Sequence, residues 1–381
     1  MEKNGWSHGR RQVAVQLKHG GWAALDVSYH LPPGRTDKRG GGRKRKAGKR
    51  GQAGAGFYPA LRRLGVVEAA SPALCEDVTL GCLSNTFAEA VEAAARSGVV
   101  IGEKRVRRIS QGAAKVALRA RERLASPGAI PPPGETALWA GRRIAVLLDG
   151  GRVQTRTNRA ASGRHRYDTA WREPKLYVVY EFDEAGRKRR KFPCRCDGTI
   201  AGPDDVVRLL VADLRLHGAA QAAHVTFLGD GAAWIWNRID EVVAAAGIPP
   251  EKTSRNLDFY HAVEHLGQIA DAMRFKNQEA RSQWLKRMKK LLKTAAPETF
   301  LAELAKARRR GNEVTRREYQ YFKKNKAAIN YREAVRRRVP IGSGAVESAI
   351  RRVVNLRLKG AGMFWLLGNA EGFLHLRCQL K

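Results

Sequence analysis

Residues 143–150 read RIAVLLDG, an apolar run that ends at the acidic residue Asp149 and is followed by glycine. Residues 224–231 read HVTFLGDG and end in the same way at Asp230. Short runs rich in aliphatic and β-branched residues and bounded by glycine are typical of buried strands. The two runs therefore predict two core strands, each with a carboxylate at its carboxyl end.

The pattern around these two runs predicts an α/β fold. The expected order is strand, strand, strand, helix, strand, helix, strand, helix. This is the order of the RNase H-like arrangement, a mixed five-stranded sheet flanked by helices. The further elements are expected at 176–182, near 190–196, at 204–217, at 234–246 and just before Asp258.

In that topology the first three strands form a meander, and a helix then crosses over to the fourth strand. Because such crossovers are right-handed, we expect the strand at 224–230 to lie beside the strand at 143–149 and parallel to it. Parallel neighbours end at the same edge of a sheet. Asp149 and Asp230 are therefore expected within reach of a common metal ion.

A third carboxylate, Glu347, lies in residues 341–348, which read IGSGAVES. The glycines and serine predict the start of a helix, with Ser343 as its N-cap. Two-metal phosphodiester chemistry needs carboxylates that hold two divalent ions ~4 Å apart, and oxygen ligands suit Mg²⁺ or Mn²⁺. We therefore predict that Asp149, Asp230 and Glu347 are the catalytic and metal-binding residues of a two-ion site.

The glycines after the first two carboxylates have an expected role of their own. Gly150, Gly151 and Gly231 carry no side chain, so we expect them to let a phosphate backbone approach the carboxylates closely. The basic stretch at 156–166 is expected to form a loop near the substrate.

The charge of the chain indicates a polyanionic partner. Lys and Arg number 71 against 36 Asp and Glu, which gives a formal net charge of +35 over 381 residues. Such an excess is costly through self-repulsion, and neutralisation of phosphates is its usual reason. We expect nucleic acid and no membrane, because no apolar run reaches the ~18 residues that a membrane span needs. A cytoplasmic location is expected because the first residues contain no apolar signal core.

Composition also divides the chain into regions. Residues 1–30 alternate around a Gly-Gly turn, which predicts a β-hairpin. Helices at 87–95 and about 103–124, the second rich in arginine, fit a helix-turn-helix-like DNA reader. The regions are a small β-hairpin region at 1–30, a basic glycine-rich linker at 31–56, a helical DNA-binding domain at 57–125, a proline-rich linker at 126–137, and a core at 138–381 with a basic helical insertion at about 266–340 before the last core helix.

Basic residues on two helices are expected to contact phosphates of DNA. The candidates on the second N-terminal helix are Arg105, Arg107, Arg108, Lys115 and Arg119. The candidates on the helix of Glu347 and just beyond it are Arg351, Arg352 and Lys359, which would hold the scissile strand.

A zinc-peptidase interpretation competes with the two-ion site only through one short motif. Residues 261–265 read HAVEH and match the H-x-x-E-H pattern of inverted zinc metallopeptidases, in which His261, Glu264 and His265 would form the site. A peptidase does not account for the charge of +35, and the histidines are equally suited to supporting the core or contacting phosphate. The five cysteines are odd in number and unevenly spaced, so a disulfide framework is not expected and Cys194 and Cys196 are interpreted as strand residues.

Four short segments in a fixed order carry a family resemblance. The chain resembles bacterial insertion-sequence transposases with an RNase H-like DDE core, the Kra-type group related to Mutator elements. The resemblance covers 138–381 and, more loosely, 57–125. The four segments are GDGAAWIWN at 229–237, LDFYHAVEHL at 257–266, PIGSGAVES at 340–348 and RLKGAGMFW at 357–365.

The resemblance implies a DNA transposase that binds element ends, nicks DNA and performs strand transfer, with Asp149, Asp230 and Glu347 as its triad and two Mg²⁺ or Mn²⁺ ions as cofactors. It maps Asp258 and His261 onto a [C/D]-x-x-H signature whose residues assist the metal site or engage the DNA strand. The implied partners are double-stranded DNA, as terminal inverted repeats and target DNA, and further copies of the chain in a dimer or larger assembly in the bacterial cytosol or nucleoid.

One feature departs from that family. Many relatives carry a cysteine-rich zinc-binding segment near the N-terminus, whereas no cysteine precedes Cys75 here. The alternative function is therefore a catalytically inactive or domesticated DNA-binding protein derived from a transposase.

Overall fold

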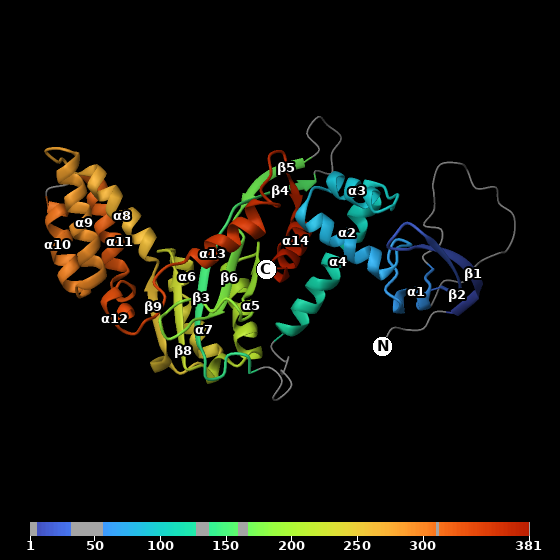
Figure 1. The fold of residues 1–381 in the computed structure, drawn as a ribbon, viewed down its shortest axis with the longest axis horizontal. Helices are drawn as coiled ribbons and strands as arrows, with labels where there is room; N and C mark the ends of the chain where they lie inside the picture. Colours follow the sequence, from blue (N-terminus) through green and yellow to red (C-terminus); the bar gives the residue numbers. More distant parts are fainter. Residues whose placement is uncertain (1–5, 32–55, 127–136, 159–166, 310–311, 381) are drawn as a thin grey trace. The chain divides into compact units, whose positions relative to one another are not determined.

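The computed structural model describes residues 6–31, 56–126, 137–158, 167–309 and 312–380 (Figure 1). The chain divides into two compact units, Met1–Val116 and Ala117–Lys381. The expected linkers at 31–56 and 126–137 lie, except for their end residues, outside the described residues. No helix in the described ranges has both the length and the apolar character needed to cross a membrane.

The first unit joins a β-hairpin to helices. Its two strands pair antiparallel with Gln16 opposite Trp22, so the alternating pattern forms the expected hairpin. Val15 and Val27 of the hairpin pack with Leu61 in a small core. The elements are β1 (Trp6–Gln16), β2 (Trp22–Leu31), α1 (Pro59–Arg63), α2 (Pro72–Ser84), α3 (Phe87–Arg96) and α4 (Glu103–Leu124), of which α4 extends into the second unit.

Both helices that the periodicity predicts in this region are present. α3 begins with a capping box, in which the Thr86 hydroxyl accepts from the Glu89 N–H at 3.2 Å and the Glu89 carboxylate accepts from the Thr86 N–H at 2.7 Å. α4 covers the range expected for the second, basic helix.

The second unit is built on a five-stranded mixed sheet with the strand order β7-β6-β3-β8-β9. β3 pairs antiparallel with β6 and parallel with β8, and β8 pairs parallel with β9. The predicted α/β core is therefore present, with the two acidic runs side by side. The strands are β3 (Arg143–Gly150), β6 (Lys175–Glu181), β7 (Arg195–Thr199), β8 (His224–Gly229) and β9 (Thr253–Leu257).

Alternate residues of the central strands face opposite sides of this sheet. Ile144 and Val146 of β3, with Val225 and Phe227 of β8, pack against helices in the main core. The intervening positions, including Asp149, face the other side, where α13 packs on β3 and β6. The helices of these layers are α5 (Pro203–Leu216), α6 (Ala233–Trp236), α7 (Ile239–Ala245) and α13 (Gly344–Ala349).

Two predicted elements need correction. The third strand begins at Arg195 rather than near residue 190, because Pro193 lacks the N–H that a ladder requires. The helix expected at 234–246 is broken into α6 and α7. The Trp236 indole donates to the Asp230 carbonyl at 2.7 Å and holds the first turn, and Arg238 then leaves helical geometry with φ −114°.

A second, three-stranded sheet is not predicted by the sequence pattern. Its strand order is β10-β4-β5, and its signal is the alternation of buried Val153 and Thr155 with outward polar residues. The stretch at 156–166 was expected to be a loop, but its first residues belong to a strand, and residues 159–166 lie outside the described chain. The strands are β4 (Val153–Asn158), β5 (Tyr167–Arg172) and β10 (Trp365–Leu366).

The basic region expected as an insertion is helical and has a core of its own. Figure 1 shows these helices gathered beyond β9 at one edge of the sheet. The helical region begins at Phe259, earlier than residue 266, because Asp258 caps its first helix. The helices are α8 (Phe259–Ala272), α9 (Gln278–Thr294), α10 (Pro297–Arg309), α11 (Glu313–Lys324) and α12 (Tyr331–Arg336); after α13 come the π-helical segment η4 (Ile350–Asn355) and α14 (Leu367–Gln379).

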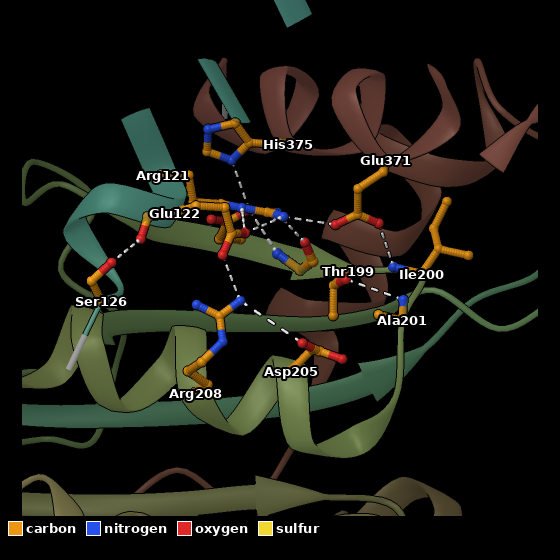
Figure 2. A network of polar contacts seen from close by, with 12 residues as sticks. Arg121, Glu122, Ser126, Thr199, Ile200, Ala201, Asp205, Arg208, Glu371 and His375 are labelled. Atoms are coloured by element: carbon orange, nitrogen blue, oxygen red, sulfur yellow. Dashed lines mark hydrogen bonds and ion pairs between the residues drawn. The ribbon is translucent and has the colours of Figure 1, made fainter. Parts of the chain in front are cut away.

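Arg121 centres a buried ion-pair network in the second unit (Figure 2). Its guanidinium donates to Glu371 at 2.8 Å and to the Gly198 carbonyl at 2.9 Å, and lies 3.7 Å from Asp197. The same Glu371 carboxylate accepts from the Ile200 N–H at 2.7 Å. The end of α4 is thereby fixed to β7 and α14.

We expect Arg121→Ala to lower the free energy of unfolding by about 3–5 kcal/mol, because it leaves buried carboxylates without their cation. Arg208→Ala is the matched control, since Arg208 pairs with Glu122 at 2.7 Å but is 37% exposed, and it should cost no more than about 1 kcal/mol. Denaturant unfolding measures both values. Equal losses in the two variants would contradict a special role for Arg121.

Candidate active site

Carboxylates lie at the carboxyl ends of three neighbouring parallel strands, which meet at one edge of the sheet. The residues before Asp149, Asp230 and Asp258 lie opposite one another in the β3-β8-β9 ladder. The Asp258 N–H continues this register by donating to the Gly229 carbonyl at 2.8 Å. The expected meeting of Asp149 and Asp230 at neighbouring strand ends is therefore found, with Asp258 beside them.

Glu347 reaches this edge from α13, on the sheet face toward which Asp149 is directed. Its ligand oxygen lies within 4.8 Å of ligand atoms of Asp258 and His261. The charges of Glu347 and Asp230 both act on Asp149. The charges therefore couple Asp149 to Asp230 and Glu347, whereas the group with metal-ligand spacing among the described residues consists of Asp258, His261 and Glu347, without Asp149 or Asp230.

Short hydrogen bonds fix the first two carboxylates. Asp149 Oδ1 accepts from the Gly150 N–H at 2.7 Å, and Asp230 Oδ1 accepts from the Ala232 N–H at 3.0 Å. Each of these bonds uses Oδ1. Within the described part of the chain, both carboxylates therefore keep an oxygen for a further ligand.

Asp258 is the fully buried member of the group, with an exposed fraction of 0%. Its Oδ1 accepts from the His261 N–H at 2.7 Å and so caps α8, and its Oδ2 accepts from the Ser343 N–H. Asp258 therefore joins the start of α8 to the loop before α13. Asp258 thereby positions His261 and, through Ser343, Glu347.

Ser343 occupies the N-cap position of α13 but does not act as predicted. Its hydroxyl makes no capping bond to the helix backbone and donates instead to Glu347 Oε1 at 2.7 Å. The side chain of Ser343 is 3% exposed, so this bond holds the Glu347 carboxylate from its buried side. Sequence capping rules miss this contact because they consider only backbone partners.

The electrostatics of the group are those of crowded negative charge. Burial raises the pKa of Asp149 to about 6, against the opposing Gly150 N–H, and the carboxylates of Asp230 and Glu347 add to the rise. For His261, burial lowers the pKa, but nearby carboxylates, Asp258 first, outweigh it and leave the pKa raised. A divalent cation would relieve this repulsion, and carboxylate oxygens are the donors that Mg²⁺ and Mn²⁺ prefer.

The approach of a phosphate over Gly150, Gly151 and Gly231 stays a prediction, and a side chain at each of them would meet other parts of the protein. A Cβ on Gly150 would lie 2.4 Å from the Glu173 carboxylate, and a Cβ on Gly231 would lie 2.1 Å from the Tyr321 ring. Their close approach therefore serves the protein's own side chains. At Gly151 a Cβ would meet Pro174 and Val354 at 3.4 Å, which is again internal packing.

The H-x-x-E-H residues do not form a common cluster among the described residues. His261 Nδ1 lies 3.1 Å from the Glu264 carboxylate, whereas His265 Nδ1 pairs with Glu318 and its ring stacks on Tyr321 at 3.7 Å. In the described chain, the group with metal-ligand spacing contains His261 but neither Glu264 nor His265. This arrangement does not support the zinc-peptidase interpretation.

The basic candidates on α4 differ in their environments. Arg105 donates to the Glu68 carbonyl at 2.8 Å and to Gln16 Oε1 at 2.6 Å, so it holds the first unit together. Arg107 pairs with Glu103, and Arg108 lies 3.4 Å from Glu68. Lys115 and Arg119 are exposed.

The candidates beyond Glu347 are all exposed. Arg351 and Arg352 project from η4, and the Arg352 guanidinium donates to the Ser348 hydroxyl at 2.6 Å. Lys359 lines a groove that also contains Gly150. Lys359 therefore lies on the same groove as the residue after Asp149, and its contact with a DNA strand stays a prediction.

Comparison of the chain with protein-family models, with curated proteins and with solved structures gave no match.

Asp149→Asn should stabilise the metal-free protein at pH 8 and change it little at pH 4. A carboxyl group whose pKa is raised loses folding stability as the pH rises from its ordinary 3.8 through about 6, a loss of roughly 3 kcal/mol at most. Denaturant unfolding in a chelator at the two pH values tests this.

Asp183→Asn is the opposite-sign control. The Arg187 N–H lowers the pKa of half-buried Asp183, so the stabilising effect of its carboxylate is present at high pH and is lost as the pH falls. Its asparagine variant should therefore be slightly less stable at pH 8. A loss of stability at pH 8 in Asp149→Asn would show that Asp149 is not repelled by its neighbours.

Proposed function

We propose that the chain is a metal-dependent DNA transposase with an RNase H-like core. The observation that carries the proposal is the convergence of Asp149, Asp230 and Glu347 on one sheet edge in a chain of net charge +35. A crowded acidic site is unfavourable in isolation, and a strongly cationic chain is unfavourable without a polyanion. Divalent ions at the site would reduce the repulsion between the carboxylates, and bound DNA would neutralise the excess positive charge of the chain.

The fold is consistent with this proposal. The strand order β7-β6-β3-β8-β9 corresponds to 3-2-1-4-5 in order of the five core strands, with β6 antiparallel and β8 parallel to β3. This is the topology expected of an RNase H-like sheet. It supports the family resemblance by an argument from topology, while function depends on the site itself.

Asp149, Asp230 and Glu347 would hold two Mg²⁺ or Mn²⁺ ions, with Asp258 as the positioning residue behind them. Bound ions of this kind activate an attacking oxygen and stabilise the leaving oxygen of a phosphodiester. Ser343 orients the Glu347 carboxylate through its hydroxyl. His261, which the Asp258 cap holds beside the carboxylates, would donate to a phosphate oxygen when it is protonated.

The substrate in this proposal is double-stranded DNA, as the terminal inverted repeats of the element and as target DNA. The N-terminal unit would recognise the ends with exposed Lys115, and exposed Arg119 follows on the part of α4 that belongs to the second unit. Arg351, Arg352 and Lys359 would hold the scissile strand. Nicking by water would expose a 3′-hydroxyl, which would attack target DNA in a complex of two or more copies of the chain.

Asp230→Asn and Glu347→Gln should each lower Mg²⁺- or Mn²⁺-dependent nicking of the element's end DNA by about 100-fold or more. That is the upper end of the loss caused by changing outer partners of a metal site, and these residues are proposed as direct ligands. DNA affinity, measured in a chelator, should be retained, because a lost carboxylate removes no phosphate contact.

Glu264→Gln is the matched control, since exposed Glu264 belongs to the rival zinc motif. It should leave nicking unchanged, whereas a zinc peptidase would lose activity on peptides. Binding of end DNA without nicking by the wild-type protein would reject the transposase in favour of a transposase-derived DNA-binding protein.

A further inference from the structure

A groove of about 710 Å³ opens directly beside the acidic site. One wall contains Gly150, the residue after Asp149, and the other contains Asn355, in the π-helical segment that continues the helix of Glu347. The groove therefore lies between the two elements that carry catalytic carboxylates. A strand whose phosphate is held at the site would pass into it.

Three cations line this groove: Arg152, Arg172 and Lys359. All three are exposed, and within the described residues none of them forms an ion pair. The acidic side chain in the groove, Glu173, is paired with Lys175 at 3.2 Å, so it does not cancel their charge. The lining of the groove therefore carries a net positive charge.

The same groove contains an exposed tryptophan. Trp171 is 56% exposed and pairs in the ladder with Gln154, and no ring contact involves it among the described residues. By contrast, Tyr167 on the same strand packs against Phe364, with ring centroids 5.9 Å apart. A single exposed aromatic residue is common on surfaces. Here it shares a groove with three uncompensated cations beside an acidic site.

We propose that this groove binds single-stranded DNA, with an unpaired base stacked on Trp171 and the adjoining phosphates on Arg152, Arg172 and Lys359. Aromatic faces and cations along one groove are the combination that binds single strands, because every base has a face that can stack. In a duplex the base faces are covered by neighbouring pairs, so Trp171 has a partner only where the strands separate. The inference rests on the proposed function for the identity of the polyanion.

The test measures binding of full-length protein to a short labelled single strand by fluorescence anisotropy in a chelator. A second strand of the same length carries abasic sugars in place of its central nucleotides. Trp171→Ala should weaken binding of the normal strand by about 5- to 150-fold, the range for losing one stacked base, and should hardly change binding of the abasic strand. Trp171→Phe should restore most of the affinity.

Two further variants separate stacking from charge. Lys359→Ala should weaken binding of both strands alike and reduce its salt dependence, because it removes a phosphate contact rather than a stacking contact. Val335→Ala, which changes an exposed apolar residue of α12 outside the groove, should leave both affinities unchanged. Thermal unfolding of each variant verifies that it is folded.

Equal weakening of the normal and abasic strands by Trp171→Ala, or no weakening of either, would overturn the stacking site. If Trp171→Ala does not fold, the other two variants decide. The stacking site is overturned if Trp171→Phe no longer binds the normal strand more tightly than the abasic strand, or if Lys359→Ala binds both strands as tightly as the wild type does. Strand binding that depends on Trp171 in a protein that never nicks DNA would keep this site and reject the transposase. Normal nicking of DNA together with single-strand binding that is unchanged in Trp171→Ala would keep the transposase and reject this site.

Discussion

The parallel register of β3, β8 and β9 is the constraint on which the acidic site depends. Three strands that end together place Asp149, Asp230 and Asp258 at one sheet edge, although their carboxylates repel one another. The cost is visible in the pKa of Asp149, which burial and then the neighbouring carboxylates raise to about 6. The apolar interior of the sheet supplies the stability that holds these residues together against repulsion, because the strands are buried on both faces.

The fourth acidic residue, Glu347, is positioned by a helix rather than by a strand of the sheet. Glu347 lies almost two hundred residues after Asp149, and the helices of the second core lie between them. Asp258 joins the two ends of this intervening region, because its carboxylate caps α8 and also accepts from the Ser343 backbone N–H. The buried hydroxyl of Ser343 then holds Glu347. The two ends of the basic helical region are therefore held together beside Asp258.

The sequence predicts those parts of the fold that depend on local pattern. The runs at 143–150 and 224–231 predict two parallel strands because burial on both faces leaves a continuous apolar signal. The β4–β5 pair is missed because β5 is exposed along its whole length and β4 buries only Val153 and Thr155, which leaves no continuous apolar signal. Distant side-chain partners are missed for another reason: Tyr321 beside Gly231, like Gln16 beside Arg105, has no signal in the local sequence of either residue.

The segment that joins the site to the groove shows how this second unit accommodates an irregular helix. After Glu347 the helix widens into the π-helical turn η4, and backbone donors skip from the Arg351 carbonyl to the Val354 carbonyl. The carbonyls of Arg352 and Val353 between them accept from the buried guanidinium of Arg377, whose pKa burial lowers to about 10. A buried arginine is a costly way to satisfy two carbonyls. Single π-turns often occur at functional sites, and this one lies between Glu347 and the groove residue Asn355.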